Sequence, residues 1–282
     1  MRIAVTGANG TVGRLVVDLL ADDHDVVAVT RRPRANAHRG TTALADYDDL
    51  PALCRAFDSV DCLVFVSSDG EAARVLNHHA NVVRAATDMN VGHVVYLSAL
   101  DADLDSPFCY AYTNGWTERL LSESMLSTSI ARASIFTEFF VARFVSPALE
   151  SGIMRLPAGT GRVSLVARED VARCLAALAV SPVGTTPHAL TGPESIDVRE
   201  VAEIVSRRGT ALQASDASPA EFDTELVRSG EDPWWTYAFS SMFASIRMHR
   251  WAATSDAVAT LTGRRPLALS DVVARSEPQA LA

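Results

Sequence analysis

Short apolar runs alternate with longer amphipathic stretches through the first half of the chain. Six runs rich in β-branched and apolar residues predict strands at Arg2–Thr6, Asp25–Thr30, Thr41–Ala45, Cys62–Val66, His93–Ser98 and Ser129–Ala133. Segments between them repeat apolar residues at helical spacing, in one stripe of Val12, Leu15, Val16, Leu19 and Leu20 and another of Val75, Leu76, His79, Val82, Val83 and Ala86. Strands alternating with helices predict a Rossmann-like, doubly wound parallel sheet.

The pattern loosens after about residue 145, where prolines and glycine-containing turns separate shorter elements. We expect residues 1–145 to form the sheet domain and residues 146–282 to form mainly a smaller C-terminal lobe. Val171, Cys174, Leu175 and Leu178 repeat at helical spacing, which predicts that a helix near residues 168–180 rejoins the sheet. The expected architecture is α/β, with a partly interleaved C-terminal lobe.

A glycine-rich turn directly follows the first predicted strand and precedes the first predicted helix. Its sequence is Gly7-Ala8-Asn9-Gly10-Thr11-Val12-Gly13. Glycine here lets the backbone approach a pyrophosphate and lets the helix pack on the strand, while free N–H groups at the helix start attract phosphate charge. Strand, turn and helix in this order predict a dinucleotide site, with Asn9, Thr11 and Val12 beside the phosphates.

The end of the second predicted strand indicates which dinucleotide binds. An NAD-selective protein places an acidic residue there to accept hydrogen bonds from the ribose hydroxyls, whereas this chain has Arg31 and Arg32. Guanidinium groups match a phosphate in geometry and charge, so the pair predicts NADP(H), held through its 2′-phosphate. The alternative is a solvated basic loop.

Polar residues also follow the third and fourth predicted strands. Asp46 stands where a side-chain oxygen accepts from the adenine amino group, and capping the next helix is an equally good account of it. Ser67 and Ser68 end the fourth strand beside the expected path of the ribose.

Composition limits the expected binding partners and the expected cellular location. The net charge of −9 and pI near 5.2 oppose binding to nucleic acid or to an anionic membrane, so we expect a small-molecule substrate and a monomer or homodimer. No apolar run approaches the roughly 20 residues that span a bilayer, and the first residues lead straight into a strand, which predicts a cytoplasmic protein. The cysteines lack metal-ligand spacing, so we expect no metal and four buried thiols: Cys54, Cys62, Cys109 and Cys174.

Several segments together resemble the NmrA-like branch of the atypical short-chain dehydrogenase/reductases, and within it most of all the type-2 NAD(P)H:quinone oxidoreductases. Besides the glycine turn, they are Tyr96–Ala99, Thr117-Glu118, Gly161–Ala172 and Leu261–Pro266. The resemblance covers most of the chain and is weakest through Ala214–Trp251. It implies that Phe136 forms one wall beside the nicotinamide, with core packing an equally good account of Phe139 and Phe140.

The resemblance also implies where catalytic groups stand. Conventional relatives carry a serine after the fifth strand and a Tyr-x-x-x-Lys pair on the next helix; Ser98, Tyr110 and Asn114 fall at those places here. The chain contains no lysine, all 25 basic residues being arginine. Asn114 can hydrogen-bond but cannot supply the charge that lowers a tyrosine pKa. Tyr110 is therefore a candidate proton donor, with a helix-face packing role as the alternative.

These features predict an NADPH-dependent oxidoreductase that passes hydride to a quinone-like or conjugated carbonyl compound. Loss of a charge-assisted acid typically costs about 10²- to 10⁴-fold, which favours acceptors whose anion is delocalised. The alternatives are a catalytically silent NADP(H)-binding redox sensor and a redox-neutral enzyme of natural-product metabolism, because one fold serves many functions.

Two further groups of residues have competing explanations. His78 and His79 suggest metal binding or proton transfer, but His79 lies within an apolar helical stripe and packing is the stronger interpretation. The segment 234–251 holds three of the four tryptophans and suggests a pocket for a flat aromatic substrate. A lobe core or a subunit interface explains it as well.

Overall fold

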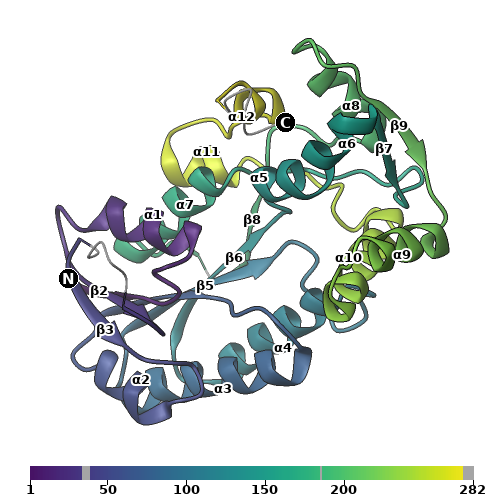
Figure 1. Cartoon of the computed structure of the whole chain (residues 1–282). Helices are drawn as coiled ribbons and strands as arrows, with labels where there is room; N and C mark the ends of the chain where they lie inside the picture. Colours follow the sequence, from purple (N-terminus) through teal and green to yellow (C-terminus); the bar gives the residue numbers. More distant parts are fainter. Residues whose placement is uncertain (34–38, 185, 276–282) are drawn as a thin grey trace.

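A parallel sheet forms the centre of the molecule. The structure is a computed structural model that describes residues 1–33, 39–184 and 186–275. Across these residues, seven strands pair in parallel in the order β3-β2-β1-β4-β5-β6-β8 (Figure 1). They are β1 (Arg2–Val5), β2 (Asp25–Thr30), β3 (Thr41–Leu44), β4 (Cys62–Val66), β5 (His93–Ala99), β6 (Ser127–Ala133) and β8 (His188–Leu190). The first six confirm the predicted strands.

Helices cover both faces of the sheet (Figure 1). On one face α1 (Thr11–Leu20) and α7 (Arg168–Val180) pack against each other, and α11 (Ala257–Thr262) packs beside α7. The other face carries α2 (Leu50–Ala56), α3 (Ala72–Asp88) and α4 (Cys109–Glu123). The predicted Rossmann-like, doubly wound architecture is confirmed.

The helical stripes are nearly as predicted, with one correction in α1. Leu19 is 48% exposed, and Val17 is buried in its place. Because α7 packs beside α1, the buried arc of α1 reaches Val17 and leaves Leu19 in solvent. In α7 the predicted stripe is fully buried, and α7 contacts β4, β5 and β6.

The second half of the chain builds a smaller lobe around its own apolar core. Its sheet is the parallel pair β7 (Ile153–Leu156) and β9 (Gln213–Asp216). Its helices are α5 (Thr137–Phe140), the π-helix η1 (Val141–Val145), α6 (Ser146–Ser151), α8 (Val198–Ser206), α9 (Pro219–Arg228), α10 (Pro233–Arg247) and α12 (Leu269–Arg275). Both α7 and β8 return to the main sheet, and the domain division at residue 145 stays a prediction.

The cysteines are free thiols, of which Cys62, Cys109 and Cys174 are buried. Cys54 is half-exposed, against the prediction, because it lies on α2 outside the buried face of Ala52, Leu53 and Ala56. Through the described ranges, no helix combines the length and apolarity required to cross a bilayer.

Candidate dinucleotide and substrate site

The site opens where β1 and β4 separate at their carboxyl ends. Thr6 bridges them there: its hydroxyl donates to the carbonyl of Val64 at 3.4 Å and accepts from the amide of Val66 at 3.0 Å. The strands next to β1 are β2 on one side and β4 on the other, so the chain order reverses at β1. Crevices at such a switch point are the usual ligand sites of doubly wound sheets.

The glycine turn fits a phosphate group closely. Gly7 has φ +61°, and a Cβ on Gly13 would lie 2.4 Å from the carbonyl oxygen of Gly7. A larger residue at Gly7 would be strained by the positive φ, and one at Gly13 would have to displace backbone. The N-cap of α1, Gly10, makes no side-chain capping bond, and the first turn holds no acidic residue. The amides of Ala8 and Gly10 bond to backbone carbonyls within the fold, and the N–H groups at the start of α1 are the ones suited to a pyrophosphate.

Arg31 and Arg32 follow β2 at the rim of the same opening, and both are exposed. The backbone carbonyl of Arg32 accepts from the side-chain amide of Asn9 at 2.9 Å and from the hydroxyl of Thr30 at 3.0 Å. Asn9 thus fixes the basic turn against the glycine turn. In the part of the chain that the structure describes, neither guanidinium forms an ion pair with a carboxylate. The positive charge is available to an anionic ligand.

A cavity of about 410 Å³ lies between these two turns. Its lining includes Asn9, Arg31, Arg32, Ser67 and Ser68 from the predicted set, together with Tyr47 and His78. Tyr47 donates to the carbonyl of Val66 at 2.7 Å, and burial raises the pKa of its phenol. A polar cavity of this size beside a basic rim suits an adenosine moiety.

The structure overturns one of the two predicted roles of Asp46, the helix cap. Its carboxylate accepts from the amide of Asp48 at 3.2 Å, and the N-cap of α2 is Asp49, which accepts from Ala52 at 2.9 Å. The helix-cap interpretation of Asp46 is therefore wrong, because the turn continues three residues further before the helix begins. The contact with adenine stays a prediction; Ala45 and Tyr47, on either side, line the cavity.

Both histidines of α3 are buried, as the packing interpretation predicted. His79 accepts from the backbone amide of Ser68 at 3.1 Å through Nε2, while Nδ1 lies 2.7 Å from the hydroxyl of Thr117. Thr117 donates onward to a backbone carbonyl at 2.8 Å, so Nδ1 carries the hydrogen. Burial lowers the pKa of His79 to about 3, which keeps the ring neutral.

His78 lies beside Asp46 and Asp48, and the three offer ligand atoms within 4.8 Å of one another. The nitrogen of His78 that faces Asp48 at 3.2 Å also faces Arg74 Nε at 3.3 Å. A cation already lies against this nitrogen, which opposes a second cation.

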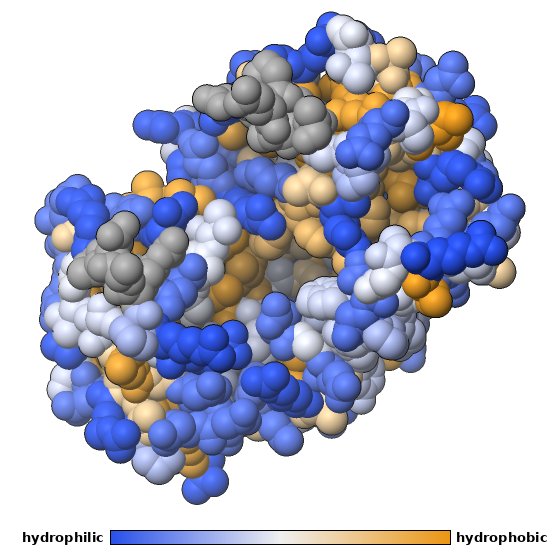
Figure 2. Space-filling view, in the orientation of Figure 1, coloured by the Kyte–Doolittle hydropathy of each residue, from blue (hydrophilic) through white to orange (hydrophobic). Residues whose placement is uncertain are grey.

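A second cavity, of about 420 Å³, continues from the first past Gly7, Gly10, Val66 and Ser67. Figure 2 shows a central hollow floored by apolar side chains between the two parts of the molecule. Its walls combine the ends of β5 and β6 with α4 and α10. The aromatic and sulfur-containing lining residues are Phe108, Tyr110, Phe136, Phe139, Trp235, Phe239, Met242 and Trp251. Such a lining suits a flat, apolar ligand.

Ser98 is buried in the wall of this cavity, and its hydroxyl donates to Glu118 at 2.5 Å. Arg132 grips the same carboxylate with two nitrogens, at 2.9 and 2.5 Å. The hydrogen of Ser98 is committed to Glu118, so toward the cavity the oxygen of Ser98 presents lone pairs. Ser98 can accept a hydrogen bond from a ligand hydroxyl or amide.

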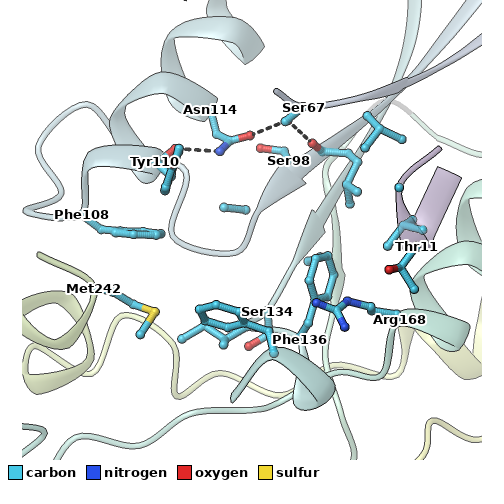
Figure 3. A pocket seen from close by; sticks show the side chains of 18 of the residues that line it. Thr11, Ser67, Ser98, Phe108, Tyr110, Asn114, Ser134, Phe136, Arg168 and Met242 are labelled. Atoms are coloured by element: carbon cyan, nitrogen blue, oxygen red, sulfur yellow. Dashed lines mark hydrogen bonds between the residues drawn. The ribbon is translucent and has the colours of Figure 1, made fainter. Parts of the chain in front are cut away.

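Asn114 is engaged on both sides of its amide (Figure 3). Its oxygen accepts from Tyr96 at 2.7 Å and from Ser67 at 3.3 Å, and its nitrogen donates to the carbonyl of Tyr110 at 2.6 Å. These bonds join α4 to the ends of β4 and β5. Asn114 therefore fixes the helix that carries Tyr110.

Tyr110 is half-buried and lines the cavity. Its hydroxyl oxygen accepts from the backbone amide of Gly70 at 2.9 Å and from the indole nitrogen of Trp234 at 3.3 Å. Tyr112, two residues on, is 41% exposed. The structure brings Tyr110, Asn114 and Ser98 to one wall, which the resemblance had suggested.

Phe136 and Arg168 lie across the cavity from Tyr110 and Asn114 (Figure 3). The guanidinium carbon of Arg168 is 5.4 Å from the ring centroid of Phe136, and the backbone amide of Arg168 donates to Glu138 at 3.1 Å. Arg168 and Trp234 were not predicted as site residues. The position of Arg168 at the start of a helix that returns to the sheet was the signal for it. Trp234 was singled out only as part of the aromatic segment 234–251, and nothing in the sequence predicts its contact with Tyr110.

The aromatic segment serves two surfaces at once. Trp235, Phe239 and Met242 line the cavity from one side of α10, while Phe243 is fully buried in the lobe core. Phe139 lines the cavity and Phe140 is core. Residues of α10 thus both line the cavity and pack in the lobe core, and the aromatic substrate for this pocket stays a prediction.

Comparisons with known proteins agree with this geometry. A model of the NAD(P)H-binding family matches residues 7–182. Quinone oxidoreductase 2 of Escherichia coli (strain K12) is 31% identical over 238 residues, which cover 81% of this chain and 82% of that protein. The NmrA-like family domain-containing oxidoreductase flvB of Aspergillus flavus is 27% identical over 290 residues, with 97% and 94% covered.

Among solved structures, the NADPH-dependent quinone oxidoreductase QOR2 of Escherichia coli, complexed with NADPH, superposes with a TM-score of 0.89 at 27% identity. The match covers 96% of this chain and 98% of that one. The glycine turn, the basic rim and the paired cavities thus occur in a chain whose likeness to these proteins extends over nearly its whole length. The chain belongs to the NAD(P)H-binding, NmrA-like family of oxidoreductases.

Proposed function

We propose that this protein uses NADPH to reduce quinone-like or conjugated carbonyl compounds. The observation that carries the proposal is the apolar, aromatic-lined cavity that continues directly from the glycine turn, with Ser98 and Tyr110 in its wall. A flat acceptor in this cavity lies next to the space where the dinucleotide chain would end. The name of the Escherichia coli relative supports a quinone as acceptor.

The cofactor would be held by three groups of residues. The backbone of Gly7 to Gly13 would hold the pyrophosphate, and Arg31 and Arg32 would hold the 2′-phosphate. Phe136 and Arg168 would flank the nicotinamide end, Arg168 adding positive charge beside Thr11. When bound, the nicotinamide supplies hydride, which is two electrons with one hydrogen.

The chain's own residues then orient the acceptor and provide the second hydrogen. Trp235 and Phe239 stack at 5.7 Å and offer a flat apolar wall. Ser98, whose hydrogen is held by Glu118, accepts a hydrogen bond from a hydroxyl or N–H group of the bound cofactor or substrate. Tyr110 gives its proton to the oxygen of the acceptor that gains charge. With asparagine at 114, the anion formed on the acceptor should be one that is already delocalised.

An acceptor panel tests the proposal. We expect purified protein to oxidise NADPH in the presence of benzoquinones, naphthoquinones and conjugated enones, followed by the absorbance of the reduced nicotinamide. Cyclohexanone, an unactivated ketone of similar size, should react at least about 10²-fold more slowly. Tight NADPH binding without oxidation by any acceptor would reject the enzyme and favour a redox sensor.

A further inference from the structure

The hydroxyl of Tyr110 lies where three separate segments meet. The loop after β4 contributes the backbone N–H of Gly70 at 2.9 Å, and the first turn of α10 contributes the indole N–H of Trp234 at 3.3 Å. Tyr110 itself comes from α4. Its ring stands at 89° to that of Trp234, with the centroids 6.2 Å apart.

The two N–H donors use both acceptor positions of the phenol oxygen. A tyrosine hydroxyl has one hydrogen to donate and two lone pairs to accept with. Among the residues that the structure describes, the Tyr110 hydroxyl accepts twice and donates to none. Its own hydrogen is left for a ligand in the cavity that Tyr110 lines.

From this geometry, and resting on the proposed function, we propose that Gly70 and Trp234 form an anion cradle that stabilises the Tyr110 oxygen when Tyr110 gives up its proton. The cradle would do the work of the lysine that the chain lacks. Two fixed N–H dipoles aimed at an oxygen that becomes negative stabilise the anion in the manner of an oxyanion hole. Trp234 is thus a positioning residue, acting through Tyr110.

The surroundings of Tyr110 oppose the loss of its proton, so the anion needs the stabilisation that the cradle provides. Burial raises the pKa of Tyr110, and the carboxylate of Asp69 raises it further. The hydrogen bonds from Gly70 and Trp234 act in the opposite direction. At neutral pH the phenol keeps its proton, so it starts the reaction as an acid.

The proton transfer is balanced without any further reactant. Hydride addition leaves a negative oxygen on the acceptor; the Tyr110 O–H bond breaks and a new O–H bond forms on that oxygen. Water then returns a proton to Tyr110. The acceptor gains two electrons and two hydrogens, and the dinucleotide is left oxidised.

Both donors are fixed before any ligand binds. Trp234 is the second residue of α10, and its backbone amide donates to the N-cap residue Asp232 at 2.8 Å. Gly70 has φ +109°, a conformation that favours glycine, and the neighbouring Ser68 is held by His79. The cradle therefore joins the substrate lobe to the sheet domain at the reacting group.

The test measures the phenol itself. A fluorinated tyrosine, which is more acidic than tyrosine, is placed at position 110 and titrated by fluorine NMR without cofactor or acceptor. We expect Trp234→Phe to raise the pKa of this phenol by about one or more, since a hydrogen bond to a charged group is worth about 1.5–3 kcal/mol. Trp116→Phe, a tryptophan of α4 outside the cavity lining, is the matched control and should leave it unchanged.

A second measurement needs no substitution of Trp234. In the protein carrying the fluorinated tyrosine, the NMR chemical shifts of the Trp234 indole N–H and the Gly70 amide N–H are followed against pH. Both should change with the same midpoint as the titration of the phenol. Absence of that shift, or an equal pKa in Trp234→Phe and Trp116→Phe, would overturn the cradle.

Kinetics separate the cradle from a purely structural role, in which Trp234 only holds α10 against α4. With the best acceptor of the panel, Trp234→Phe should lower kcat about tenfold and leave KM within twofold. If Trp234 has only that structural role, Trp234→Phe should raise KM and leave the pKa of the phenol unchanged. If no acceptor is reduced by the unsubstituted protein, the proposed function fails, while the titration still decides whether the cradle exists.

Discussion

Arg31 and Arg32 have exposed side chains on a turn whose backbone is held through the carbonyl of Arg32. The dinucleotides NADPH and NADH differ by one phosphate, so the discrimination must come from single residues. We expect the double substitution of both arginines by alanine to weaken NADPH binding at least about 10- to 100-fold, since losing even one charged hydrogen bond costs about 1.5–3 kcal/mol. Titration calorimetry with both dinucleotides measures the effect.

The control for this substitution is Arg84→Ala, an exposed arginine of α3 that pairs with Asp88. It should leave both affinities unchanged. NADH affinity should also stay within about twofold in the double variant, because only the 2′-phosphate contact is removed. An equal loss for both dinucleotides would show that the arginines hold the loop rather than the phosphate.

Gly13 has a single, steric reason to be glycine. A Cβ there would lie 2.4 Å from the carbonyl oxygen of Gly7, so α1 would have to move away from β1. We expect Gly13→Ala to cost about 1–3 kcal/mol of unfolding free energy, as overpacking does, and to weaken NADPH binding at least tenfold. Urea unfolding and calorimetry test this, with the neighbouring exposed Arg14→Ala as control. Unchanged affinity would mean that the turn does not hold the phosphates.

The sequence supplied the residues whose chemistry is local and missed those whose partners are distant. Gly7, Gly10 and Gly13 predict a phosphate-binding turn because the strand, the turn and the helix follow one another directly in the sequence. The roles of Trp234 and His79 depend on contacts 124 and 11 residues away, across elements whose placement the sequence does not state. The cap alternative for Asp46 was wrong because aspartates at 46, 48 and 49 are all suitable, and only the course of the backbone selects Asp49.

Between elements, His79 links α3 to α4 and to the loop after β4. Its pKa is about 3 in the folded protein against 6.5 in an unfolded chain, because burial disfavours the charged ring. The unfolded state therefore binds more protons between these values, and stability is full above pH 6.5 and falls as the pH drops toward 3. At pH 5 the loss attributable to His79 is about 2 kcal/mol.

The pH effect is checked by urea unfolding at pH 7.5 and pH 5. The side chain of His79→Asn does not titrate, so this variant should lose about 2 kcal/mol less than the unsubstituted protein over the same interval. Contributions of other groups, such as the buried His93 with its lowered pKa, cancel in the comparison. Identical pH dependence in both proteins would contradict the assignment.

Element prediction succeeded wherever an element carried its own pattern. Six strands of four or more residues were found from their apolar runs, within two residues at each end. The strands of the second half, β7, β8 and β9, were missed, because segments of three or four residues carry no detectable period without the alternation of strands and helices that marks the first half. The pairing of β8 with β6 is decided by the course of the chain after α7.

Over the whole molecule, Asp101 ties the loop after β5 to the C-terminal lobe. Its side chain is 2% exposed and accepts from Ser106, from Ser245 and from Arg250 at 3.0 Å. Removing the cation leaves a buried carboxylate without its counter-charge, so Arg250→Met should cost about 3–5 kcal/mol. Urea unfolding measures it.

The matched control is Arg247→Met, three residues earlier on an exposed position that pairs with Asp216. A surface pair of this kind is worth about 1 kcal/mol or less. The double variant Asp101→Asn with Arg250→Met should recover part of the loss, since both charges are then absent. An equal loss of unfolding free energy in Arg250→Met and Arg247→Met would show that the ion pair of Arg250 with Asp101 stabilises the fold no more than a surface pair does.

The strand β8 and the helix α7 return from beyond residue 150 to complete the main sheet and its helical cover. A gene fragment that stops at residue 145 would therefore release a protein whose β6 has a bare hydrogen-bonding edge and whose α1 has lost its apolar neighbour. Such an edge recruits other strands, so the fragment should precipitate on expression instead of behaving as a portable nucleotide-binding module. Any transplant of this cofactor site into another protein has to carry the returning segments with it.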